Sequence, residues 1–456
     1  MSGTFSSLTS ALSALRYNRV AMDVASNNVA NASTAGYARR QVVAQSTGAP
    51  AQPVIWSRWD GAVGGVEPGA VTRMVDPILD ARARVEHAGS SFSDTRAASL
   101  ENLETAVAEP GDSGVAAALQ SFQAAWHSVA NNPGDGAART QALATAQTLR
   151  DTIAAQGTAV SDEWDSQRSA LDAAAGEVNQ VAGQLADLNK GLRSSYVGGT
   201  DAGTLLDQRD QLTLRLAELT GAKVSINPDT TVDVTVAGQD LVKGNNAFAV
   251  AVSGSTTLAG NGADPVTLSV NGTPVTLTTG QVGAQQQLLS TDLPGYQSSL
   301  DGFVATLASS VNAQHRAGVD LDGAQGGDFW SGTTAATLQV AITDPRKVAA
   351  ADPAKGGLDN TNATALGSAD IGGTQYRNLV TKLGVTVSSA RQGATNQATL
   401  AAQVDASREA ISGVSTDEEM VNLLTAQHGY EAASRVMTTL DSMLDTLIHD
   451  TGLVGR

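Results

Sequence analysis

The sequence lacks or is poor in several residue types, and each shortage excludes a kind of protein. Cysteine is absent from the 456 residues, so the chain has no disulfide, no thiolate metal ligand and no cysteine nucleophile. Aromatic residues make up only 4% of the chain, so its cores must consist mainly of Ala, Val and Leu, which suits slender helical bundles. No apolar run reaches the roughly 18 residues of a membrane-spanning helix, so we expect no membrane insertion.

Positive charge is also scarce. The chain holds 28 Lys and Arg against 45 Asp and Glu, which gives a formal net charge of −17. Because such a surface repels phosphate backbones, we expect no binding to nucleic acid or to anionic membranes. No Lys or Arg precedes Arg16, so the N-terminus lacks the charged region of a cleaved secretory signal. We therefore expect a protein that stays inside the cell or leaves it without N-terminal cleavage.

Both ends of the chain carry an apolar stripe at the spacing of a coiled-coil helix. The first predicts an N-terminal helix about 40 Å long that ends at the turn-forming residues 31–36, and it consists of Phe5, Leu8, Leu12, Leu15, Met22 and Val29. The second predicts a C-terminal helix and consists of Leu423, Ala426, Tyr430, Ala433, Met437, Leu440, Leu444 and Leu447. Either Ser415 with Glu418 or Thr416 with Glu419 forms a capping box at its start.

The periodicity predicts an α+β, mainly α chain. Residues 77–219 repeat apolar positions at helical spacing, whereas residues 223–280 alternate Val and Thr with polar residues as strands do, with a hairpin signal at Asn271 and Gly272. We expect an elongated helical bundle in residues 37–222, which begins with short strands and is completed by residues 283–318 and 371–412. Residues 223–282 form an inserted β domain, residues 319–370 an irregular or β segment, and residues 1–36 pair with residues 413–456 as an inner assembly domain.

The partner of the two apolar stripes is left open by their spacing. An isolated helix with one stripe is marginal in water, and a Leu or Met contributes about 1.5–3 kcal/mol only once it is buried. The two terminal helices can cover each other, and the small polar residues beside the stripes leave room for further helices. The pattern is equally consistent with packing between subunits and with a coiled-coil stalk inside one chain.

Motifs at both ends and inside the chain resemble one known group of proteins. Residues 25–41, ASNNVANASTAGYARRQ, are similar to the N-terminal signature shared by the flagellar axial proteins, which comprise the rod, hook and hook-associated families. Residues 412–448, which begin SGVSTDEEM, look like their shared C-terminal helix. Inside the chain, residues 109–143, 204–219 and 311–330 resemble the hook-associated protein 1 (FlgK) family, and the most specific run is LLDQRD at Leu205–Asp210.

The resemblance implies a structural role and a set of partners. It implies a hook-filament junction adaptor, not an enzyme and without a cofactor, that is exported through the flagellar type III channel and acts outside the cell. It polymerises with copies of itself and contacts the hook protein and the next hook-associated protein. A cytoplasmic export chaperone covers the C-terminal helix before export. The alternatives are a hook or rod protein, against which LLDQRD argues, or a secreted adhesin-like binding module with the β domain as its ligand face.

The resemblance also implies where subunits meet. The N-terminal helix lines the inner tube and the Asn-rich turn joins it to the next domain, where Gly36 permits a chain reversal and Tyr37 and Arg39 face a neighbour. The expected assembly interface consists of Leu8, Leu12, Leu15, Met22, Asn27, Asn28, Asn31, Gly36, Tyr37, Arg39, Leu423, Tyr430, Met437, Leu440, Leu444 and Leu447.

Enzyme chemistry finds little support in the residues themselves. None of the five His, including His428 on the C-terminal helix, stands at metal-ligand spacing to another. Asp207 and Asp210 could form a carboxylate pair, but Arg209 between them favours ion pairing within and between helices. The loop with Asp320, Asp322 and Asp328 resembles a calcium loop but lacks the closing bidentate Glu. We therefore expect no catalytic, cofactor or metal site.

Overall fold

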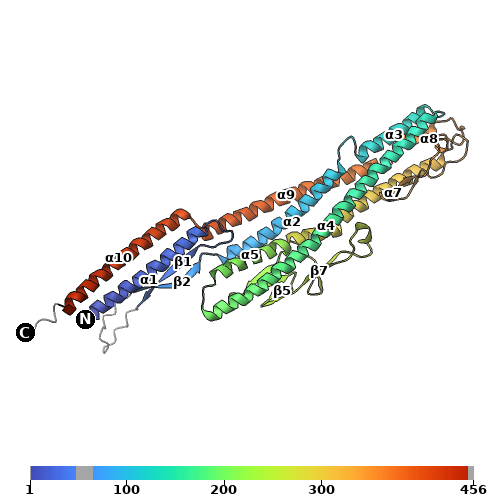
Figure 1. Ribbon diagram of the computed structural model, residues 1–456. Coiled ribbons are helices and arrows are strands. Elements are labelled where there is room, and N and C mark those ends of the chain that lie inside the picture. Colours follow the sequence, from blue (N-terminus) through green and yellow to red (C-terminus); the bar gives the residue numbers. More distant parts are fainter. Residues whose placement is uncertain (1, 48–64, 450–456) are drawn as a thin grey trace, which may run out of the picture.

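The computed structural model describes residues 2–47 and 65–449, except for the side chains of residues 2–6, 47, 447 and 448. Helices make up 65% of the chain and the sheets are small and antiparallel, as the periodicity predicts. Figure 1 shows an elongated molecule with the terminal helices at one extremity, a helical bundle running to the other, and β strands beside the bundle. Across the described residues, no helix is long and apolar enough to cross a membrane.

The terminal unit contains two long helices and one hairpin. Helix α1 (Ser2–Ala30) packs against α10 (Thr416–His449), and strands β1 (Arg40–Thr47) and β2 (Gly65–Arg73) form an antiparallel ribbon that packs on α1. Ser415 caps helix α10 as predicted, because the backbone N–H of Glu418 donates to Ser415 Oγ at 3.4 Å, whereas the side chain of Glu418 pairs with Arg39. The apolar stripes therefore do form helices, and the hairpin lies with them.

The bundle is built from long helices with sequence-encoded ends. Asp76 and Asp135 cap the helices that follow them, and Gly199 and Gly221 end α4 and α5 with positive φ, as expected for a glycine C-cap. The helices are α2 (Pro77–Val107), α3 (Val115–Asn131), α4 (Gly136–Gly198), α5 (Gly203–Thr220), α6 (Gly280–Gln287), α7 (Leu293–Ala317), α8 (Thr361–Ser368) and α9 (Gly373–Ser412). Helices α2 and α9 pair along the shaft nearest the terminal unit (Figure 1).

Four aromatic side chains and one histidine form a cluster in the outer part of the bundle. Phe122, Trp126, Phe329, Trp330 and His315 stack with ring centroids 5.4–6.3 Å apart. This cluster joins α3 and α7 to residues 319–370, whose short elements are β10 (Trp330–Ser331), β11 (Gln339–Val340), a 3-10 turn (Pro345–Lys347) and α8. The segment expected to be irregular or β thus contributes to the core and contains one helix that its sequence did not predict.

Helices α6 and α7 are joined by one π-helical turn, Leu288–Asp292. A π turn leaves a backbone carbonyl without its usual helical partner. Here the carbonyl of Leu289 accepts a hydrogen bond from the indole Nε1 of the fully buried Trp164, at 3.0 Å. The irregular turn is therefore fixed by a specific contact with α4.

The predicted β domain consists of two small sheets that pack on α4. One contains β3 (Lys223–Ile226), β4 (Val232–Val236), β5 (Gln239–Lys243) and β6 (Asn246–Ala247), and the other β7 (Val250–Ser253), β8 (Thr267–Val270) and β9 (Thr273–Val275), with a 3-10 turn at Leu258–Gly260. Asn271 and Gly272 link β8 to β9 with φ of 51° and 75°, which confirms the hairpin signal. Asn179 and Asn189 of α4 each hydrogen-bond strand backbone, at Val250 and Val232 respectively.

Lowering the pH is expected to weaken the outer part of the bundle through His315. This side chain is fully buried, Ala349 N–H donates to its Nε2 at 2.8 Å, and its Nδ1 lies 2.7 Å from the carbonyl of Gly327. Burial lowers the pKa of His315. Its contribution to stability is therefore complete above the ordinary His pKa of about 6.5 and is lost as the pH falls through the lowered folded value.

The measurement compares thermal unfolding of the wild type with that of His315→Gln across this pH range. The variant should lose about 1–3 kcal/mol near neutral pH, because buried backbone groups lose their partners. The difference in melting temperature should shrink as the pH falls, and a difference that does not change with pH would contradict the assignment.

Raising the pH is expected to weaken the shaft of the bundle through His87. His87 of α2 lies 2.9 Å from Asp405 of α9 and 3.4 Å from Glu218 of α5. The hydrogen bond with Glu218 and the charge of Asp405 raise the pKa of His87. The stabilisation is therefore complete below about pH 6.5 and is lost as the pH rises through the raised folded pKa. Urea unfolding should show a deficit for His87→Gln at acidic pH that disappears at alkaline pH, the opposite trend to His315.

Candidate assembly interface

The two terminal helices pack antiparallel along a narrow seam, in which Asn18 lies against Gly429 and Asn28 against Glu419. A Cβ atom on Gly429 would lie only 2.6 Å from Asn18 Oδ1, so the backbones approach closely. The fully buried apolar residues of the seam are alanines: Ala11, Ala25, Ala426 and Ala433. Ala11 and Ala25 did not figure in the predicted stripe, although the heptad spacing of positions 11, 18 and 25 was the available signal.

The larger predicted stripe residues flank the alanine seam. Eight of them are half-buried: Leu8, Leu15, Met22, Val29, Leu423, Met437, Leu440 and Leu444. Leu12 and Tyr430 remain 41% and 39% exposed. The side chains of Phe5 and Leu447 lie outside the described residues. The predicted stripes therefore face, in large part, the other terminal helix of the same chain.

Helix α10 also carries five apolar side chains that remain exposed, and we call them the outer row. They are exposed by 47–62% and comprise Met420, Val421, Leu424, Val436 and Met443. Sequence reasoning missed them because they interrupt the regular stripe spacing and stand among polar residues. Large apolar side chains left exposed along a helix are typical of a surface that is covered in an assembly.

Asn28 is the centre of the joint between α1, α10 and the hairpin. It is fully buried, and its Nδ2 donates to the carbonyl of Arg40 at 2.8 Å and to Glu419 Oε2 at 2.9 Å. Its Oδ1 accepts from the backbone N–H of Arg40 at 3.0 Å and from the hydroxyl of Tyr37 at 2.8 Å. These four bonds use the full capacity of the amide. By contrast, Asn27 and Asn31 bond only to backbone carbonyls and Thr34 in their own turn.

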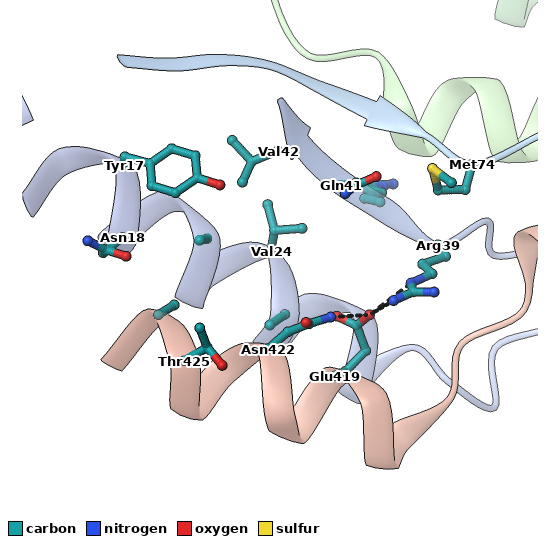
Figure 2. A pocket seen from close by; sticks show the side chains of 14 residues that line it. Tyr17, Asn18, Val24, Arg39, Gln41, Val42, Met74, Glu419, Asn422 and Thr425 are labelled. Carbon is teal, nitrogen blue, oxygen red and sulfur yellow. Dashed lines mark hydrogen bonds and ion pairs between the residues drawn. The ribbon is translucent and has the colours of Figure 1, made fainter. Parts of the chain in front are cut away.

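Glu419 joins the N-terminal turn of α10 to the hairpin. Its side chain is 3% exposed, and Arg39 approaches it with Nε and Nη2 both at 2.8 Å from Oε1. Arg39 also pairs with Glu418 at 3.1 Å. Figure 2 shows Arg39 and Asn422 beside Glu419, to which Asn422 donates. A buried carboxylate paired with a guanidinium and placed near a helix N-terminus is well stabilised.

The polar atoms of Tyr37 and Arg39 bond within the chain, whereas the sequence suggests that they face a neighbour. Burial raises the pKa of the Tyr37 hydroxyl, which donates to Asn28. The predicted reversal at Gly36 has a φ of +74°, and a Cβ there would collide with Gln211 of α5. The Asn-rich turn is therefore a joint made by residues of one chain.

Beside this joint lies a groove of about 300 Å³ between α1, the hairpin and the first turns of α10 (Figure 2). Tyr17, Val24, Val42, Met74 and Thr425 are among the side chains that line it. The groove is partly apolar and continues the surface of the terminal unit.

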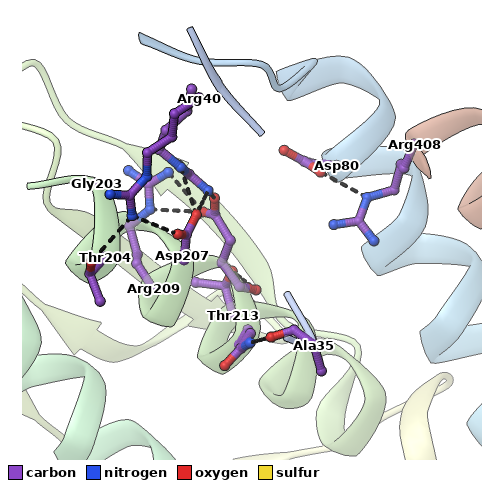
Figure 3. A network of polar contacts seen from close by, with 12 residues as sticks. Ala35, Arg40, Asp80, Gly203, Thr204, Asp207, Arg209, Thr213 and Arg408 are labelled. Atoms are coloured by element: carbon purple, nitrogen blue, oxygen red, sulfur yellow. Dashed lines mark hydrogen bonds and ion pairs between the residues drawn. The ribbon is translucent and has the colours of Figure 1, made fainter. Parts of the chain in front are cut away.

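The LLDQRD run lies on α5, where it receives the hairpin (Figure 3). Asp207 binds Arg73 at 2.8 Å and Arg40 at 3.2 Å, and Asp210 binds Arg73 at 2.8 Å. Arg209 pairs with Asp210 at 2.7 Å and donates to the carbonyl of Thr230. The two carboxylates are thus neutralised by three arginines, which supports ion pairing over acid/base catalysis.

Comparison with known proteins agrees with this arrangement. The family model of the flagellar hook-associated protein FlgK helical domain matches residues 100–330. The chain belongs to the FlgK family of flagellar hook-associated proteins. Models of the flagella basal body rod protein and of the rod FlgEFG protein C-terminal region match residues 8–37 and 408–449, the two helices of the terminal unit.

Relatives that match this chain over nearly its whole length carry the name flagellar hook-associated protein 1. The Bacillus subtilis protein is 29% identical, and the alignment covers all of both chains. The Escherichia coli protein is 25% identical, and the alignment covers 97% of this chain and 99% of the relative. The flagellar hook junction protein FlgK from Burkholderia pseudomallei shares the fold, with a TM-score of 0.65 at 18% identity, covering 72% of this chain and all of that one. The chain is accordingly a structural component of the flagellum and not an enzyme.

The remaining candidate sites of this FlgK family member are occupied by its own side chains. Asp320 and Asp322 pair with Lys347 at 3.0 and 3.1 Å, and Asp328 pairs with Arg316 at 2.6 Å. The carboxylates of the calcium-like loop are therefore neutralised by basic side chains of the same chain. His428 is largely exposed on α10. Within residues 2–47 and 65–449, no group of three or more His, Asp or Glu is placed to hold a metal ion.

Asn28→Ala is expected to loosen the terminal unit, whereas Asn27→Ala is its matched control. Removing the Asn28 amide takes the bond of Asn28 away from Glu419 Oε2, which leaves Glu419 with Arg39 and Asn422, and takes the side-chain partner from both backbone groups of Arg40, at an expected cost of about 3 kcal/mol. Limited proteolysis should then cut α1 and α10 faster while the bundle melts at an unchanged temperature. Equal protease resistance of Asn28→Ala and Asn27→Ala would contradict the central role of Asn28.

Proposed function

We propose that the protein is the adaptor at the hook-filament junction and that it polymerises through its terminal unit. The family assignment supports the first part, because the FlgK helical-domain model matches residues 100–330, whereas the rod-protein models match only the two end regions of this chain. The outer row on α10 is the observation that supports the second. The β sheets turn their Val and Leu side chains into the bundle core, which leaves the adhesin alternative without a comparable surface.

The terminal unit has two apolar surfaces with different partners in this proposal. The alanine seam is closed inside the chain, since α1 and α10 cover each other. The outer row is left for a sister molecule, and each of its side chains would contribute about 1.5 kcal/mol on burial. Residues Leu12 and Tyr430, which are partly exposed at the flanks of the seam, would extend the same contact.

The proposed partners follow from position along the flagellar axis. One face of the polymer contacts the hook protein, the opposite face contacts the next hook-associated protein, and other copies of the chain lie beside it. Before export, a cytoplasmic chaperone covers α10. The exposed outer row supports this last partner as well, because an uncovered apolar surface favours aggregation.

Val421→Asp or Leu424→Asp is expected to impair assembly without unfolding the monomer. Each substitution places a charge on the outer row, and losing about 1.5 kcal/mol of apolar burial should raise the critical concentration for self-assembly about tenfold. Sedimentation of the purified protein and filament attachment in cells are the measurements.

Gln427→Asp provides the control, because it adds the same charge at an exposed polar position of α10. A seam substitution such as Leu440→Asp should behave differently and loosen α1 from α10 in the monomer. Normal filament attachment with both outer-row variants would refute assembly through this surface.

A further inference from the structure

The terminal unit and the bundle touch each other little. Across the described residues, every extensive contact between helices or strands lies within the terminal unit or within the bundle. The chain crosses between them twice, at residues 74–76 and 413–415. These crossings lie side by side, because the N–H of Arg39 donates to the carbonyl of Ser412 at 2.9 Å and the N–H of Met74 donates to the carbonyl of Arg39 at 2.8 Å.

Two adjacent crossings define a hinge axis but leave rotation about it free. A third attachment away from that axis is needed to fix the angle between the two units. The structure supplies one on α5 (Figure 3), where Asp207 binds Arg40 and Arg73, Asp210 binds Arg73, and Gln211 donates to the carbonyl of Ala35.

We infer that the N-terminal half of α5, residues 203–211, is a latch that sets the angle of the terminal unit on the bundle. Asp207 and Asp210 are its positioning residues. The side chains of Arg73 and Asp207 are each 9% exposed, so their charge-assisted bonds are largely shielded from water. This inference concerns the single chain and does not depend on the proposed polymerisation.

The shape of the joint supports a polar latch over apolar packing. A cavity of about 330 Å³, lined by Gly36, Asp80, Asp405 and Val414 among others, separates the two units beside the crossings. Glycine makes room for the latch, because a Cβ on Gly203 would lie 2.8 Å from the guanidinium carbon of Arg40. The polar contacts on α5 therefore have little apolar packing to assist them.

Gly203→Ala and Asp207→Asn test the latch in different ways. Alanine at the first position of α5 should favour the helix by about 1 kcal/mol relative to glycine, yet its Cβ displaces Arg40 while keeping every charge. Asparagine keeps the shape of Asp207 and removes the charge that two arginines share. Gly176→Ala on α4 is the matched control, since a Cβ there meets nothing within 4 Å.

The readout is the distance between spin labels on the full-length monomer. The chain has no cysteine, so Gln427→Cys on α10 and Gln180→Cys on α4, both exposed, give one label in each unit. The unsubstituted protein and Gly176→Ala should give one narrow distance distribution, whereas Gly203→Ala and Asp207→Asn should broaden and shift it at an unchanged melting temperature of the bundle. An unchanged distribution in either folded variant, or a loss of cooperative bundle melting, would overturn the inference.

Discussion

One buried amide holds the terminal unit together. Asn28 bonds α10 through Glu419, strand β1 through Arg40, and the segment between α1 and β1 through Tyr37, with no remaining hydrogen-bond capacity. Its partners would otherwise be buried polar groups without compensation, which is costly. The alanine seam between α1 and α10 buries little apolar area. The helices still pack in one register because this polar joint fixes it.

The molecule divides its stabilisation by region. The bundle is held by an apolar core with aromatic stacking at its outer part, whereas the terminal unit and its attachment to α5 rely on ion pairs and hydrogen bonds. Apolar cores are close-packed and resist rearrangement, while polar contacts at a joint can be exchanged for others at small net cost. A rigid bundle with a polar joint suits a subunit that assembles with other axial components of the flagellum.

The sequence predicted helices better than it predicted contacts. Stripes at three- and four-residue spacing were sufficient for α1, α10 and the long bundle helices, and Asn-Gly was sufficient for one hairpin, because these signals are local. The predicted stripes contained Ala426 and Ala433 but missed Ala11 and Ala25, and a stripe does not reveal which of its residues lie closest to the partner. Asn27, Asn28 and Asn31 are chemically identical in the sequence, and only burial separates Asn28 from the others. Nothing in the spacing links Asp207 to Arg40, which lies 167 residues away.

Helix α4 has a mechanical consequence. It runs without interruption for 63 residues, about 95 Å, from the outer part of the bundle to the short turn before α5. A force or torque applied at the outer end of the bundle is therefore transmitted along one continuous helix to α5, beside Asp207. Load would thus reach the terminal unit through a stiff member and not through loops, and the ion pairs there would be the first contacts to bear it.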